Sequence, residues 1–134
     1  MIGIDSSVLI DMLRNKLPER SLRELSKEDQ LCTSEIVVYE VLCGIYSAQH
    51  STEQRLKEFT AMLDSFTFIF PVERATSIRA AQIAGKLLKS GQTIEHTDSL
   101  IAGSLLANGC KRFITKNVKD FERIKELELI KVPT

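Results

Sequence analysis

The chain has no excess of charge of either sign and no long apolar run. Its 134 residues contain 18 Lys and Arg against 18 Asp and Glu, so no overall positive field indicates a nucleic-acid binder. A polyanionic partner would have to be held by local patches, by metal ions or by another subunit. No apolar stretch approaches the ~20 residues that span a bilayer, and no signal peptide is present. We therefore expect a cytoplasmic protein with no membrane attachment.

Cysteine and histidine are also scarce. Cys32, Cys43 and Cys110 are an odd number, are widely spaced and form no Cys-x-x-Cys pair, and His50 and His96 are the two imidazoles. This pattern gives little support to a zinc site of the Cys/His kind. It suits a reducing compartment, and we expect the three cysteines to be small buried hydrophobic residues.

The residues that are present favour a single α/β domain spanning residues 1–134. The hydrophobic fraction of 43% and the charged fraction of 27% are those of an ordinary globular protein. Apolar patterns predict strands at 1–5, 31–34, 66–70, 112–115 and 129–132. Helical patterns lie between them: after Ser6 and Ser7, from Pro18, and at 35–45, 52–63, 73–90, 98–108 and 118–126. This alternation predicts a mainly parallel sheet between layers of helices.

Several carboxylates lie where such a fold places reactive groups, outside the carboxyl ends of the strands. Asp5 ends the first strand, Asp120 follows the strand that ends at Thr115, and Asp98 begins a helix. Each also has an ordinary structural explanation. Asp5 can be a helix N-cap, Asp98 can be stabilised by a helix dipole, and Asp120 can be a solvated helix residue.

Glu40 is harder to explain as a structural residue. It lies between the apolar runs 36–39 and 41–42, and no Lys or Arg occurs between Glu35 and His50. A carboxylate in a core costs several kcal/mol or changes its pKa unless it is paired or binds a metal.

Taken together, these carboxylates point to metal-dependent chemistry. Crowded at one sheet edge they would repel one another, and a divalent cation such as Mg²⁺ or Mn²⁺ would relieve that repulsion. Such an ion can activate water for attack on a phosphodiester. An aspartyl-phosphate phosphatase is a weaker alternative, because Ser7 stands where those enzymes need a second Asp.

Four segments, in order, resemble the motifs of PIN-domain proteins. They are IDSSVLI (4–10), SEIVVYEVLCG (34–44), DSLIAG (98–103) and FITKNVKDF (113–121). The length and motif spacing are most similar to the VapC-type ribonuclease toxins of toxin–antitoxin modules. The resemblance implies a three-layer α/β/α fold, Mg²⁺ or Mn²⁺ dependence and endonucleolytic cleavage of RNA. It also implies homodimers and inhibition by an antitoxin protein.

The resemblance assigns roles to residues of this chain. Asp5, Glu40 and Asp98 match the acidic core, with Asp5 and Asp98 as metal ligands and Glu40 as a ligand or general base. Ser6 matches a polar residue that supports the first Asp.

The fourth motif departs from the family pattern, because Asn117 stands two residues after Thr115 where many relatives have Asp. Asn can coordinate through its carbonyl but brings no charge, so Asp120 is the candidate for the missing catalytic carboxylate. This departure leaves open a catalytically weakened PIN-like module that only binds RNA or assembles with a partner.

Four basic side chains lie beside the acidic motifs in sequence. They are candidates for contact with RNA phosphates, although each can equally be an ordinary solvated surface charge: Arg14, Lys16, Lys116 and Lys119.

Overall fold

The computed structural model describes residues 1–132, and a five-stranded, wholly parallel sheet lies at its centre. The strand order is β3-β2-β1-β4-β5, so β1 is central. The strands are β1 (Ile2–Ile4), β2 (Leu31–Ser34), β3 (Phe68–Phe70), β4 (Arg112–Ile114) and β5 (Glu128–Ile130). The sequence prediction of a parallel α/β sheet is confirmed.

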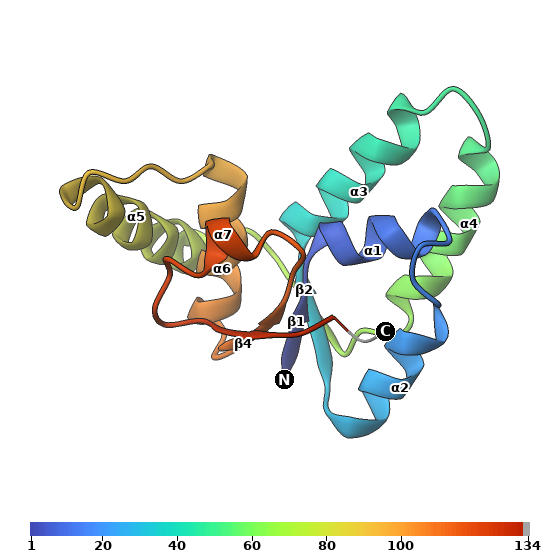
Figure 1. Cartoon of the computed structure of the whole chain (residues 1–134), viewed down its shortest axis with the longest axis horizontal. Helices are drawn as coiled ribbons and strands as arrows, with labels where there is room; N and C mark the ends of the chain where they lie inside the picture. Colours follow the sequence, from blue (N-terminus) through green and yellow to red (C-terminus); the bar gives the residue numbers. More distant parts are fainter. Residues whose placement is uncertain (133–134) are drawn as a thin grey trace.

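Helices cover both faces of the sheet and complete a three-layer α/β/α fold (Figure 1). The helices α1, α2, α3 and α4 lie to one side of the sheet, and α5 and α6 lie together on the other. The short α7 follows β4. Their bounds are α1 (Ser6–Leu13), α2 (Arg20–Glu28), α3 (Glu35–Ser47), α4 (Thr52–Leu63), α5 (Arg74–Lys89), α6 (His96–Ala107) and α7 (Val118–Phe121).

Helices bury both faces of the central strands, of which β1 is apolar throughout while β2 ends in the polar Thr33 and Ser34. Every residue of β1 and β2 is buried. On the other side, α5 and α6 approach closely at Gly103. A Cβ there would lie 2.8 Å from Ala80 Cβ and from the carbonyl oxygen of Thr76. The glycine of the DSLIAG segment therefore lets α5 and α6 pack in close contact.

Asp5 is the N-cap residue of α1, the ordinary structural role considered for it, although its side chain makes no capping hydrogen bond. Some predicted boundaries were wrong. The helix expected from residue 98 begins two residues earlier, so Asp98 lies within its first turn. The helix expected over 118–126 ends at Phe121, and the last strand is 128–130. The predicted domain end at 133–134 falls outside the described residues.

Two further expectations can be compared with the described residues. Cys32 and Cys110 are buried as expected, but Cys43 is exposed on α3. The prediction of three buried cysteines was wrong because residue 43 falls on the solvent side of that helix. Among residues 1–132, no helix is long and apolar enough to cross a membrane.

Candidate active site

Asp5 lies at the carboxyl edge of the sheet, between the end of β1 and the start of α1. Its backbone N–H donates to the carbonyl of Ile114, which fixes it beside the end of β4. Hydroxyl groups hold its carboxylate: Thr115 donates to Oδ2 at 2.6 Å and Ser7 donates to the same oxygen at 3.0 Å. Asp5 is 1% exposed, and burial raises its pKa although these hydrogen bonds oppose the shift.

Glu40 reaches the same place from α3. That helix begins directly after β2, where the Ser34 side chain accepts a hydrogen bond from the Ile36 N–H and caps it. One turn further along, Glu40 Oε1 accepts a hydrogen bond of 2.9 Å from the Ser6 hydroxyl. The Ser6 oxygen also lies 3.5 Å from Asp5 Oδ1, so one serine bridges the two carboxylates. Burial raises the pKa of Glu40, and the charge of Asp5 adds to the rise.

Asp98 approaches from the other helical layer, in the first turn of α6. It is buried, and burial raises its pKa to about 6, with the charges of Asp5, Asp120 and Glu40 contributing in that order. Glu95, on the same segment, adds to this rise, so four carboxylates act on Asp98. The structure thus brings together Asp5, Glu40 and Asp98, which are 35 or more residues apart in sequence. We call these three carboxylates the acidic group.

The fourth motif lies beside this group. Thr115 is buried, and its hydroxyl both donates to Asp5 and accepts from the backbone N–H of Asn117. Asn117 precedes α7 and is exposed, as is Asp120 within that helix. The charge of Asp120 contributes to the raised pKa of Asp98. Asp120 is therefore near enough to act on the acidic group, whereas the Asn117 side chain makes no capping hydrogen bond.

Within residues 1–132, no basic side chain forms an ion pair with this acidic group. In the part of the chain that the structure describes, the ion pairs involve other carboxylates, those of Asp11, Asp29 and Glu126. Lys116 is adjacent in sequence to Thr115, yet its ammonium pairs with Asp11 on α1. The acidic group is therefore left with mutual repulsion, which is the situation that a bound cation relieves.

The donor set fits a hard divalent ion in chemistry but is not arranged around one. All of its ligating atoms are carboxylate or hydroxyl oxygens, as Mg²⁺ and Mn²⁺ prefer. Within residues 1–132, however, no three Asp, Glu, His or Cys side chains converge closely enough to hold an ion as they stand. Asp5 and Glu40 instead direct oxygens toward hydroxyl groups. Binding of an ion would require the carboxylates to move closer together than they stand.

The four basic candidates for RNA contact are not equivalent. Arg14 and Lys16 are exposed beyond the far end of α1, about 13 Å along the chain from Asp5. Lys116 is held by Asp11. Lys119 lines an open cleft with Asp120, His96 and Arg123. Of the four, Lys119 is the one that the structure places in a cleft shared with the acidic motif.

Two polar residues of the site escaped the sequence analysis. Ser7 bonds Asp5 and also accepts a hydrogen bond from the backbone N–H of Lys116, which ties α1 to the loop after β4. The side chain of Thr97, next to Asp98 on α6, opposes the rise in the pKa of Glu40. Each is a hydroxyl residue within two positions of a predicted acid, and that neighbourhood was the signal available.

Family comparison agrees with this geometry. A model of the PIN domain matches residues 2–127. The chain belongs to the PIN-domain family. Ribonuclease VapC1 of Rickettsia felis is 33% identical over 131 residues, which cover 96% of this chain and 94% of that protein. A tRNA(fMet)-specific endonuclease VapC of Shigella flexneri is 22% identical, with 90% and 89% of the two chains covered. The predicted resemblance to VapC-type ribonucleases is confirmed, and with it the enzyme class.

Solved structures share the fold of this VapC-type chain. VapBC2 of Rickettsia felis, bound to a DNA fragment from its promoter, superposes with a TM-score of 0.86 at 22% identity. The match covers 99% of this chain and all of that chain. VapBC-1 of nontypeable Haemophilus influenzae gives a TM-score of 0.80 at 25% identity, with 98% of each chain covered. A toxin–antitoxin complex of Klebsiella pneumoniae gives 0.70 at 18% identity, with 96% of each chain covered.

Proposed function

We propose that this VapC-type ribonuclease is an Mg²⁺- or Mn²⁺-dependent endonuclease that hydrolyses RNA phosphodiester bonds at the acidic group. Asp5 and Asp98 would hold the ion, and Glu40 would bind it or act as the general base. One observation carries the proposal. Three carboxylates with raised pKa values share one site and lack a basic partner. Such groups favour either a proton or a cation, and the cation is what phosphodiester hydrolysis needs.

The ion, when bound, supplies positive charge for the phosphate and lowers the pKa of water. The protein side chains do the rest. Asp5 is oriented by the hydroxyl groups of Ser7 and Thr115, which restrict its rotation before any ligand arrives. Asp98 is the carboxylate whose pKa is raised by the largest number of neighbouring charges. A bound cation would therefore interact favourably with Asp98 and relieve its repulsion with them.

Glu40 is suited to take the proton from the attacking water. Its raised pKa brings it closer to neutrality, where a carboxylate is an effective base. Ser6 donates to one of its oxygens and leaves the other free of that bond. In-line attack on phosphorus would leave a 5′-phosphate and a 3′-hydroxyl. Asp120 would add negative charge at the rim, where Asn117 adds none.

Metal titration combined with RNA cleavage tests this proposal. We expect metal-free protein to bind Mg²⁺ or Mn²⁺ and to cut tRNA or mRNA only with the ion present, and a chelator to stop cleavage. Glu40→Gln should reduce the rate by ~10²-fold or more while the fold is retained. Glu35→Gln is the matched control, because Glu35 is exposed on the same helix. Cleavage that survives the chelator, or equal activity of the two variants, contradicts the assignment. Metal binding without cleavage would favour the catalytically weakened module.

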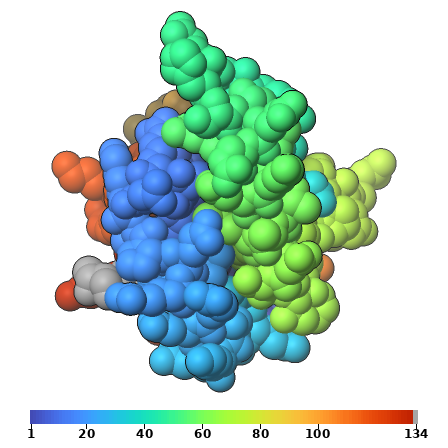
Figure 2. Space-filling model, turned by 90° about the vertical axis from the view of Figure 1, so that its right-hand side faces the viewer, coloured from blue at the N-terminus to red at the C-terminus, as the bar shows by residue number. Residues whose placement is uncertain are grey.

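Partner proteins are the second part of the proposal. A solved toxin–antitoxin complex shares this fold. We propose that this chain likewise binds an antitoxin protein and that it acts in the cytoplasm. Figure 2 shows the face where α1 and α2 (blue) lie beside α4 (green). A shallow hollow of about 20 Å³ on this side of the fold lies between Ile10, Arg14 and Arg55, over the buried Val41 and Ile45. Two arginines beside such a hollow suit an acidic side chain of the antitoxin.

A homodimer is the third part. Tyr39 and Tyr46 lie seven residues apart on α3 and are 61% and 65% exposed, so both project from one face of that helix. Exposed aromatic side chains of this kind are enriched at protein contacts. Light scattering should report a dimer for the wild type and a lower mass for Tyr39→Ser/Tyr46→Ser. A monomeric wild-type chain would overturn this part alone.

A further inference from the structure

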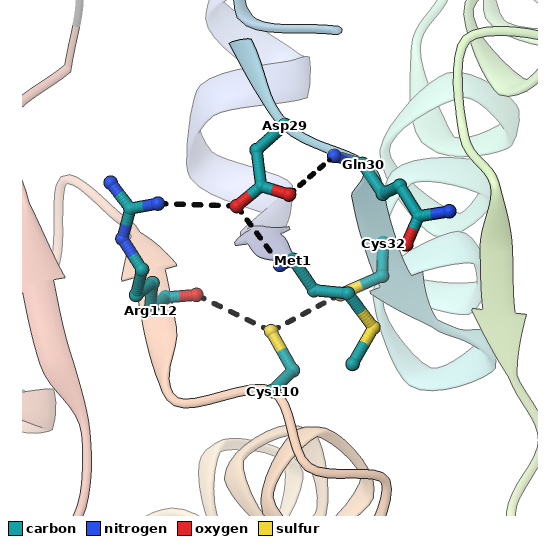
Figure 3. Close-up of polar contacts among 6 residues, drawn as sticks. All are labelled: Met1, Asp29, Gln30, Cys32, Cys110 and Arg112. Carbon is teal, nitrogen blue, oxygen red and sulfur yellow. Dashed lines mark hydrogen bonds and ion pairs between the residues drawn. The ribbon is translucent and has the colours of Figure 1, made fainter.

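Cys32 and Cys110 meet in the core at the edge of the sheet opposite the acidic group (Figure 3). Cys32 is the second residue of β2, and Cys110 lies in the turn between α6 and β4. Their sulfur atoms are 3.2 Å apart, although 77 residues separate them in sequence. They are 0% and 1% exposed. Two thiols that could have been any small apolar residues are thus in direct contact.

The backbone explains how thiols on opposite sides of β1 come into contact. Cys32 is the register partner of Gly3 in β1, and on its other side Gly3 pairs with Phe113 of β4, three residues after Cys110. Gly109 adopts φ +79°, a left-handed conformation that glycine tolerates without strain. That turn places Cys110 after α6, where its N–H donates to the Leu105 carbonyl.

The two thiols are chemically unequal. The S–H of Cys32 donates to the sulfur of Cys110. This bond lowers the pKa of Cys110 and raises that of Cys32. The S–H of Cys110 in turn donates to the carbonyl of Arg112 at 3.4 Å. Two thiols in direct contact are the arrangement from which a disulfide forms once one of them has lost its proton.

We propose that Cys32 and Cys110 are an oxidative modification site, which a hydroperoxide converts into a reversible disulfide. The Cys110 thiolate attacks one peroxide oxygen, the O–O bond breaks, and hydroxide leaves and takes up a proton to become water. The resulting sulfenic acid is attacked by Cys32, which forms the S–S bond and releases a second water. In total, two thiols are oxidised by two electrons and one hydrogen peroxide is reduced to two waters.

Little movement is needed to form this bond. A disulfide has an S–S distance of about 2.0 Å, so the sulfur atoms must approach by about 1 Å through side-chain rotation. The product would join β2 to the segment preceding β4, the two neighbours of central β1. Closing a long loop restricts the unfolded chain, so the oxidised form should resist unfolding. The acidic group lies at the other edge and should keep its activity.

Cys43 offers a clean background for the test, because it is the exposed cysteine and could form intermolecular disulfides. Purified full-length Cys43→Ser protein is treated with hydrogen peroxide and then denatured in a thiol-alkylating reagent. We expect loss of two alkylatable thiols, an intact mass lower by about 2 Da and a non-reduced peptide that links residues 32 and 110. The unfolding temperature should rise by roughly 5–10 °C and return after dithiothreitol.

Single variants in the same background separate the two cysteines. Cys32→Ser should stop at a sulfenic acid on Cys110, trapped by a dimedone-type probe, whereas Cys110→Ser should react far more slowly. If either variant folds poorly, the parent Cys43→Ser protein still decides the question by mass and peptide mapping. Unchanged thiols at peroxide levels that oxidise exposed cysteines, or addition of oxygen without a linked peptide, would overturn the proposal. RNA cleavage by the oxidised protein is a separate readout, so this result and that of the proposed nuclease function can fail independently.

Discussion

Carboxylates lie in opposite electrostatic environments at the two edges of the sheet. At the carboxyl edge, Asp5 and Asp98 are buried without a basic partner, and burial raises the pKa of both. At the amino edge, Asp29 accepts from the amino group of Met1, from Arg112 and from the Gln30 N–H (Figure 3). These bonds lower the pKa of Asp29.

The difference separates the part of the sheet that supports the fold from the part that holds the site. A neutralised carboxylate stabilises the folded state, whereas an unneutralised one destabilises it unless a ligand arrives. Sites that bind charged ligands commonly carry such a cost. The following predictions test the contrast, beginning with the largest expected effect.

Equivalent substitutions at the two edges should have opposite consequences. Asp5→Asn should reduce RNA cleavage by ~10³-fold or more, because it removes a proposed metal ligand. It should leave the metal-free unfolding temperature unchanged or higher, since a buried charge is lost. Asp29→Asn should retain cleavage and lower the unfolding temperature. The measurements are RNA cleavage with Mg²⁺ and thermal unfolding in chelator. Loss of cleavage in both variants, or in neither, would show that the edges do not differ.

Stability should respond to pH in two separate windows. The pKa of Asp98 is about 6, against an ordinary value of 3.8, so the folded state binds the proton more tightly. Protonated Asp98 stabilises the folded state fully below pH 3.8, and this stabilisation is lost as the pH rises through 6. The free energy of unfolding should fall by at most ~3 kcal/mol over that range. Asp29 has a lowered pKa, so its contribution is present above pH 3.8 and is lost as the pH falls further.

Denaturant unfolding of metal-free protein between pH 2 and pH 8 measures both windows. Asp98→Asn should remove the change in the free energy of unfolding between pH 4 and pH 7, and Asp29→Asn should alter it only below pH 4. Saturating Mg²⁺ should make the free energy of unfolding rise between pH 4 and pH 7 instead of falling, because the ion binds the deprotonated carboxylates. If Mg²⁺ leaves the profile unchanged, the acidic group is not a cation site.

Removing the hydroxyl of Thr115 should affect both stability and activity. Thr115→Val deletes the 2.6 Å hydrogen bond to Asp5 and should cost about 1–2 kcal/mol and roughly 10-fold in cleavage. Thr33→Val is the matched change in β2, where the hydroxyl donates to the Ile4 carbonyl. It should cost similar stability and little activity. Equal activity losses in the two variants would mean that Thr115 supports the sheet rather than Asp5.

The smallest effect is expected at the fourth motif. Asn117→Asp adds a charge near the acidic group and should tighten Mg²⁺ binding several-fold, and Asp120→Asn should weaken it by a similar factor. Calorimetric titration at constant ionic strength measures both. Because both residues are exposed on or beside α7, stability should hardly change. An Asp120→Asn protein with unaltered affinity would remove Asp120 from the site.

Sequence reasoning was most successful where the chemistry is local. The order of strands and helices followed from apolar periodicity. The prediction that Glu40 has a functional role followed from the absence of basic neighbours on its helix. It was least successful at boundaries and at exposure. Cys43 was expected to be buried, but α3 turns it toward solvent, because one face of a helix in an outer layer has nothing to pack against.

What the sequence determined by itself is the α/β alternation, the set of acidic residues and their order along the chain. What only the tertiary structure decided is which of them share a site. The three carboxylates come from the turn between β1 and α1, from α3 and from α6, and their meeting depends on the parallel strand order and on the close packing that Gly103 permits. The contact between Cys32 and Cys110 was equally invisible in the sequence, because sequence spacing carries no information about side chains brought together across a sheet.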